Sequence, residues 1–130
     1  MDYECRHGIR WGHSILLMNL EPYMKLRGDW EFPCWGWAKE VYLGELGILL
    51  PDLPLTKEDT HGWYKIDKGT ERPMDFMFFK KSKWKRHVGI CLGSGLMAHY
   101  EEDGLGAMIE RYKSVIWRNR LMSVYRHDSI

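Results

Sequence analysis

The sequence predicts an α+β domain in which N-terminal helices pack on a central antiparallel β-sheet. Two observations lead to this fold class. Apolar residues recur at helical spacing before residue 50, and short apolar or alternating runs follow after residue 73. The chain has 130 residues, of which 45% are hydrophobic and 28% charged. This is the size of one globular domain (1–130), and the composition excludes a disordered chain.

Two helices are expected. The first runs from Ser14 as its N-cap to about Arg27, with Pro22 marking a kink or a break within it. The second begins beside Pro33 and ends at Gly47, since helix-spaced apolar residues lie between them.

The strands are expected in the second half of the chain, after a long loop with one helical turn near Thr56. A hairpin has the turn Gly93-Ser94-Gly95 at its tip. The expected strands are 74–79, 87–92, 96–100, 115–117 and 121–125.

The charge balance argues against large anionic partners. The net charge is +1, so nucleic-acid binding is not expected, and the basic run 80–86 is interpreted as a solvated hairpin tip. The longest apolar run, 15–18, is too short for membrane insertion. No secretory signal is expected in residues 1–10.

Three cysteines, an odd number, argue against a closed disulfide framework and suggest either a reduced compartment or one thiol kept free for chemistry. Cys34 is the candidate, because the positive end of the second helix would stabilise its thiolate. Cys91 is interpreted as a packing residue. A zinc site at Cys5, His7 and His13 would need four ligands at a recognised spacing, so no metal and no cofactor are expected.

The hairpin supplies the other groups that a thiol nucleophile needs. With a three-residue turn, His87 and His99 are diagonal neighbours on one face, with backbones about 7–8 Å apart. His87 would then act as general base and acid, and His99 would orient it. The backbone N–H of Cys34 would stabilise the oxyanion. Gly89, opposite His99, would leave room for substrate.

Three segments resemble the NlpC-type cell-wall cysteine peptidases of the papain-like superfamily: GDWEFPCWG (28–36), RPMDFMFF (72–79) and HVGICLGSGLMAH (87–99). The resemblance is strongest over 28–126, and the short forms encoded among bacteriophage tail genes are the most similar. Residues 117–126 are similar to the closing strands of that branch. This chain has Pro33 where the family commonly has Asp, and Trp35 where many cellular members have a small hydroxyl residue.

The resemblance implies a minimal papain-like fold and a catalytic triad of Cys34, His87 and His99. It implies hydrolysis of peptidoglycan peptide stems, typically between D-γ-glutamate and a diamino acid. Trp35 and Phe32 join Gly89 as candidate substrate-binding residues. The phage branch implies a virion location, other tail-tip or baseplate proteins as partners, and action during cell entry.

Two alternatives remain open. One is a catalytically weak structural protein of the tail tip with the same fold, in which exposed aromatic residues anchor neighbouring proteins. The other keeps the triad but acts as an amidase or acyltransferase.

Overall fold

Two helices precede six strands in the computed structural model, which describes residues 20–50, 62–83, 85–102 and 105–130. This order confirms the α+β class. The elements are α1 (Glu21–Met24), α2 (Pro33–Leu46), β1 (Trp63–Ile66), β2 (Phe76–Lys80), β3 (Arg86–Gly93), β4 (Leu96–Glu101), β5 (Gly106–Arg111) and β6 (Leu121–His127).

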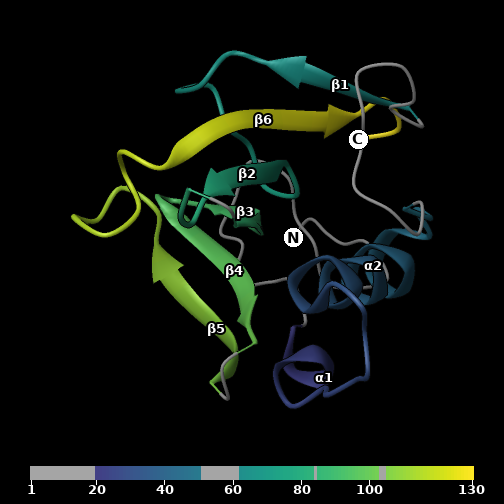
Figure 1. Ribbon diagram of the computed structural model, residues 1–130. Coiled ribbons are helices and arrows are strands. Elements are labelled where there is room, and N and C mark those ends of the chain that lie inside the picture. The colour runs from purple at the N-terminus through teal and green to yellow at the C-terminus, as the bar shows by residue number, and fades with distance from the viewer. Residues whose placement is uncertain (1–19, 51–61, 84, 103–104) are drawn as a thin grey trace.

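The six strands form one sheet in the order β1-β6-β2-β3-β4-β5, with every neighbouring pair antiparallel. Strands β2 to β5 follow each other as a meander, and the last strand, β6, lies between β1 and β2 (Figure 1). The C-terminal strand therefore joins the early strand β1 to the rest of the sheet.

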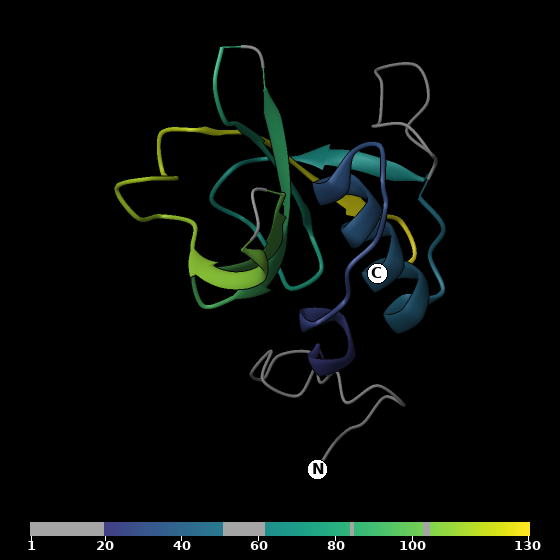
Figure 2. The ribbon, with the colours of Figure 1, turned by 60° about the horizontal axis from the view of Figure 1, so that its bottom comes forward.

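Helix α2 packs against β3 and β4, the two strands that carry the predicted histidines. Pro33 occupies the first turn of α2, where a backbone N–H would have no acceptor within the helix, so its lack of an N–H costs nothing. Gly47 ends the helix in the left-handed conformation at φ +68°. The helix lies along one face of the sheet (Figure 2), and α1 contacts it through Tyr23, which donates to Glu45 and accepts from Trp37. These caps match the predicted bounds of the second helix.

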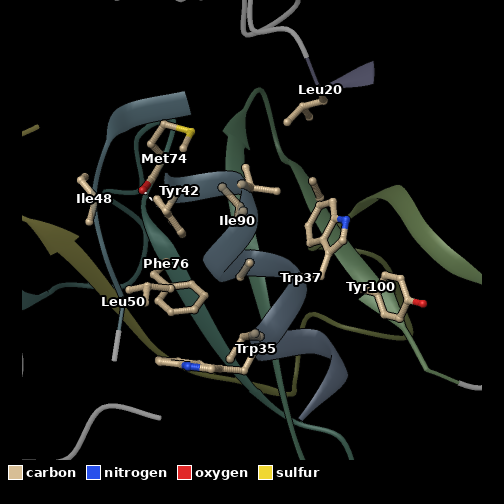
Figure 3. Close-up of a cluster of buried hydrophobic side chains, with 14 of the residues drawn as sticks. Leu20, Trp35, Trp37, Tyr42, Ile48, Leu50, Met74, Phe76, Ile90 and Tyr100 are labelled. Carbon is tan, nitrogen blue, oxygen red and sulfur yellow. Dashed lines mark hydrogen bonds between the residues drawn. The ribbon is translucent and has the colours of Figure 1, made fainter. Parts of the chain in front are cut away.

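The sheet has a buried apolar cluster on each face. The helix-side cluster includes Trp35, Trp37 and Tyr42 from α2, packed against Phe76 and Ile90 (Figure 3). The cluster on the far side contains Phe79, Cys91, Trp117 and other side chains. Cys91 is fully buried there, as expected of a packing residue.

The β3–β4 hairpin has the register that the sequence predicts. Ile90 pairs with Ala98 and Cys91 with Met97. The turn is tighter than expected, because Ser94 and Gly95 alone have turn geometry, both with positive φ, and a bulge follows Cys91. The bulge supplies the residue that the shorter turn lacks, so the histidines still share a face.

Three expectations about local structure were wrong. Within the described residues, the first helix covers only Glu21–Met24, because Pro22 lies in its first turn and starts a short helix there. Residues 115–117 form turns rather than a strand, and Val115 is 80% exposed. Strands β1 and β5 were not predicted, since both are short and half exposed.

The predicted cap Ser14 and the predicted turn near Thr56 lie outside the described residues. None of the helices described here is long and apolar enough to cross a membrane.

Candidate active site

Cys34 is the second residue of α2, directly after Pro33. The chain enters the helix through Phe32, whose extended backbone has φ −120° and ψ 91°. Cys34 is half-buried and faces a cavity of about 870 Å³. Its backbone N–H belongs to the first helical turn, where N–H groups have no intrahelical acceptor. That N–H is therefore a candidate donor to an oxyanion.

The Cys34 thiol lies against the backbone of β3. Burial raises the pKa of this thiol, while hydrogen bonds from the backbones of Val88 and Trp35 stabilise the thiolate and lower it in part. Glu102 raises the pKa further and Lys81 lowers it. The net direction is upward, so the expectation of a lowered pKa at the helix start was wrong. Burial outweighs the favourable dipoles here.

His87 and His99 meet on the sheet face opposite α2. His87 Nε2 lies 2.8 Å from His99 Nδ1, and His99 Nε2 lies 2.6 Å from Glu110 Oε2. An ionised carboxylate can only accept, so His99 donates from Nε2 to Glu110 and accepts at Nδ1. His87 must then donate from Nε2, which leaves its Nδ1 unprotonated. The hydrogen-bond chain thus leaves Nδ1 as the His87 nitrogen that is free to accept a proton.

Trp117 covers the two imidazoles. Its ring stacks on His87 at 5.3 Å with an interplanar angle of 20°, and it meets His99 edge-on at 5.4 Å. His87 is 3% exposed and His99 is fully buried. Burial, followed by the proximity of His99 and of Lys81, lowers the pKa of His87 to about 3. Burial also lowers the pKa of His99, against the opposing effect of Glu110. Both rings are therefore neutral near pH 7.

Cys34 and His87 both lie near the start of β3, but on opposite faces of the sheet. Cys34 contacts the backbone of Val88, the residue after His87, whereas the His87 side chain lies with Trp117. Within the described residues, no hydrogen bond joins Cys34 to His87 or to His99. The structure therefore brings the two histidines together and places the thiol at the backbone of the residue after His87, without direct contact to either imidazole.

The cavity beside Cys34 is lined by both aromatic and charged side chains. Acidic and basic side chains both line it: Glu31 and Glu102, with Lys85 and Arg86. The remaining lining residues are Phe32, Pro33, Trp35, Phe78, Val88, Met122, Ser123 and Tyr125. A groove with both charges suits a ligand that carries carboxylates and an amino group.

Comparisons with known proteins agree with this fold. Residues 19–126 match the sequence pattern that defines the NlpC/P60 family. The chain belongs to the NlpC/P60 family. No relative was found among curated proteins.

Two solved structures show the same fold as this NlpC/P60 chain. One is an NlpC/P60 family protein from Bacillus cereus, with a TM-score of 0.57 and 20% identity over 72% of this chain. The other is the NlpC/p60 domain of the peptidoglycan hydrolase SagA, with a TM-score of 0.55 and 22% identity over 72% of this chain. The match spans 31% of the first protein and 74% of the second.

Two of the three candidate substrate-binding residues of this NlpC/P60 chain line the cavity beside Cys34, and the third does not. Phe32 and Trp35 line the cavity, although Trp35 is only 2% exposed. Gly89 is buried away from the cavity. A Cβ atom added to it would lie 3.0 Å from the Met97 sulfur and 3.5 Å from the Phe79 ring, so side chains already fill the space beside it.

Glu110 and Trp117 contact the histidine pair and were not predicted to be functional. Glu110 lies on β5, which the sequence did not reveal, and Trp117 lies in a segment expected to be a strand. Glu110 pairs with Met97, two residues from His99. Residues 106–111 read GAMIER, an apolar run followed by two charged residues, so no alternating pattern places Glu110 on that face. Cys5, His7 and His13 lie outside the described residues.

Proposed function

We propose that this NlpC/P60 chain is a cysteine peptidase that hydrolyses the peptide stems of bacterial peptidoglycan, with Cys34, His87 and His99 as its triad. The observation that carries the proposal is the chain of hydrogen bonds from Glu110 through His99 to His87. It leaves the base nitrogen of His87 unprotonated beside the strand residue that the Cys34 thiol contacts. Family membership and the likeness to the peptidoglycan hydrolase SagA support the substrate class.

In this proposal the resting groups are both neutral. On substrate binding, His87 Nδ1 takes the thiol proton as Cys34 Sγ attacks the scissile carbonyl carbon. The backbone N–H of Cys34 stabilises the resulting oxyanion. His87 then donates the proton to the leaving amine and afterwards activates the water that hydrolyses the thioester. This mechanism requires the thiol and the imidazole to come within hydrogen-bond distance when substrate binds, since catalytic contacts are often long without substrate.

Digestion of purified muropeptides tests this function. We expect the wild type to cleave the bond between D-γ-glutamate and the diamino acid, which mass spectrometry detects as two new fragments. Cys34→Ala should give none. Identical product patterns from the two proteins would contradict the proposal, and transfer of the acyl group to an added amine would indicate an acyltransferase.

A catalytically weak structural protein is the second candidate function. It is favoured by the lack of a hydrogen bond between Cys34 and His87 in the described residues and by the raised pKa of the thiol. If the chain is such a protein, the wild type and Cys34→Ala will leave muropeptides equally intact.

We further propose that the protein acts at the tip of a bacteriophage tail, with tail-tip or baseplate proteins as partners. The similarity of the Cys34 segment and of the closing strands to tail-associated forms supports this location, as do exposed apolar side chains such as Val115 and Ile116. Mass spectrometry of purified particles should detect the chain in the virion. Its absence from particles while it is present in the infected cell would contradict this location.

A further inference from the structure

The two histidines share their buried cluster with a carboxylate. One ligand atom from each of His87, His99 and Glu101 lies within 4.8 Å of the others. His87 Nε2 is 2.8 Å from His99 Nδ1, which is 3.7 Å from Glu101 Oε2. Four ligands at about 2.0–2.1 Å around a tetrahedral zinc ion lie roughly 3.3 Å apart. Both distances therefore fall within about half an ångström of the spacing in a zinc site.

We propose that His87, His99 and Glu101 bind a divalent ion of the zinc class, and that this ion reversibly inhibits the peptidase. Imidazole nitrogen is a preferred ligand of such ions, and two histidines with one glutamate form an established three-residue zinc set. The inhibitory part rests on the proposed function, whereas the binding part does not.

Binding would convert His87 to its other tautomer. The ion takes the lone pair of His99 Nδ1 and displaces the hydrogen bond between the rings. The proton on His87 Nε2 moves to Nδ1, and the freed Nε2 binds the ion, so both rings stay neutral. His87 Nδ1, the nitrogen that would take the Cys34 proton, then carries a proton itself. Inhibition follows from loss of the base.

Two neighbours adjust the strength of this site. Glu110 accepts from the opposite nitrogen of His99, at 2.6 Å, and a carboxylate in this position orients a metal-bound histidine. Lys81 forms an ion pair with Glu101, and its ammonium competes with the ion for the same carboxylate. Removal of Lys81 should therefore increase the affinity of the site for metal. No such increase is expected if the three residues have only a structural role.

Titration of the full chain with Co²⁺ tests the site, because the visible absorption of cobalt reports its ligands. We expect one equivalent to bind the wild type. Glu101→Gln should weaken the affinity at least tenfold, and Lys81→Met should increase it. Glu102→Gln is the matched control for affinity, since Glu102 pairs with Lys85 and lies outside the cluster. Circular dichroism shows whether each variant is folded.

Equal affinities in wild type, Glu101→Gln and Lys81→Met would overturn the proposal, because the ion would then bind elsewhere. A sulfur-to-cobalt charge-transfer band in the wild type would also overturn it, since the proposed ligands contain no thiolate.

Inhibition is measured separately by muropeptide cleavage with added Zn²⁺. We expect activity to fall as zinc is added, to return with a chelator, and to need less zinc in Lys81→Met. Unchanged cleavage at saturating zinc would contradict the inhibitory role. Complete lack of cleavage without zinc would instead contradict the proposed function, while the cobalt result would still stand.

Discussion

Cys34 experiences two opposing influences on its thiol. Backbone N–H groups at the helix start and at Val88 favour the thiolate, while burial favours the thiol and dominates. Reactivity therefore depends on a base within reach, and the helix alone does not provide it. In the proposed mechanism His87, which is buried and neutral, would supply that base.

Alkylation of Cys34 by iodoacetamide should have a pH midpoint above the ordinary thiol value of 9.0. A raised pKa means a smaller thiolate fraction at each pH, and the thiolate is the reactive form. Peptide mapping separates Cys34 from Cys91, whose pKa burial raises to about 11. The same chain in urea serves as the reference, and a folded midpoint below the urea midpoint would refute this interpretation.

Glu110→Gln tests the positioning role of Glu110. A glutamine amide can donate to His99 Nε2, which allows a proton on His99 Nδ1 and forces His87 into the tautomer that has no free Nδ1. We expect kcat to fall within the roughly 10²–10⁴-fold that a general base contributes, with KM unchanged.

Glu110→Asp, which keeps the carboxylate, should restore part of the activity lost in Glu110→Gln. Equal loss of activity in both variants, or a rise in KM in place of a fall in kcat, would show that Glu110 does not act by setting the tautomers of His99 and His87.

At the scale of elements, α2 and the β3–β4 hairpin carry the residues of the candidate site. Gly36 on α2 lets the side chain of Trp30 pack directly against the helix backbone. A Cβ atom at Gly36 would overlap the ring of Trp30, which packs edge-on against Tyr100 at 5.4 Å. The helix therefore needs glycine two residues after Cys34.

Gly36→Ala should lower the free energy of unfolding by about 1–3 kcal/mol, the usual cost of overpacking. Trp30 fluorescence should change because the ring must move. Leu43→Ala is the control on the same helix, because Leu43 is 50% exposed, and chemical denaturation should show it to be within about 0.5 kcal/mol of wild type. Equal stability of Gly36→Ala and wild type would be inconsistent with the close packing.

The sequence predicted these two elements well because their signals are local. Pro33 marks the start of the helix and Gly47 its end. The glycine turn sets the hairpin register that places the side chains of His87 and His99 within hydrogen-bond distance. The contributions of Glu110 and Trp117 could not be predicted, since they come from strand pairing and from a turn far along the chain. The raised pKa of Cys34 was also missed, because burial is a tertiary property.

At the scale of the whole molecule, a buried ion pair ties the last strand to the start of β2. Arg126 Nε and Nη2 each donate at 2.8 Å to the carboxylate of Asp75. Asp75 is fully buried and Arg126 is 8% exposed. Because β6 lies between β1 and β2, this pair links residues 51 positions apart across the sheet.

Asp75→Ala should destabilise the fold by about 3–5 kcal/mol, since it leaves a buried guanidinium without its partner. Asp75→Leu combined with Arg126→Met should recover much of this loss. Glu102→Ala removes the exposed pair with Lys85 and should cost about 1 kcal/mol or less. Urea unfolding measures all three, and a cost for Asp75→Ala no larger than that for Glu102→Ala would show that the pair does not hold the sheet together.

The formation of a thioester on Cys34 tests the central claim most directly. The wild type is mixed with muropeptide, quenched in acid within a turnover and analysed by intact mass spectrometry and peptide mapping. We expect an added mass equal to the acyl part of the stem, located on the peptide that contains Cys34 and absent from Cys34→Ala. Cleavage that proceeds in Cys34→Ala, with no adduct at residue 34 of the wild type, would contradict a cysteine peptidase mechanism.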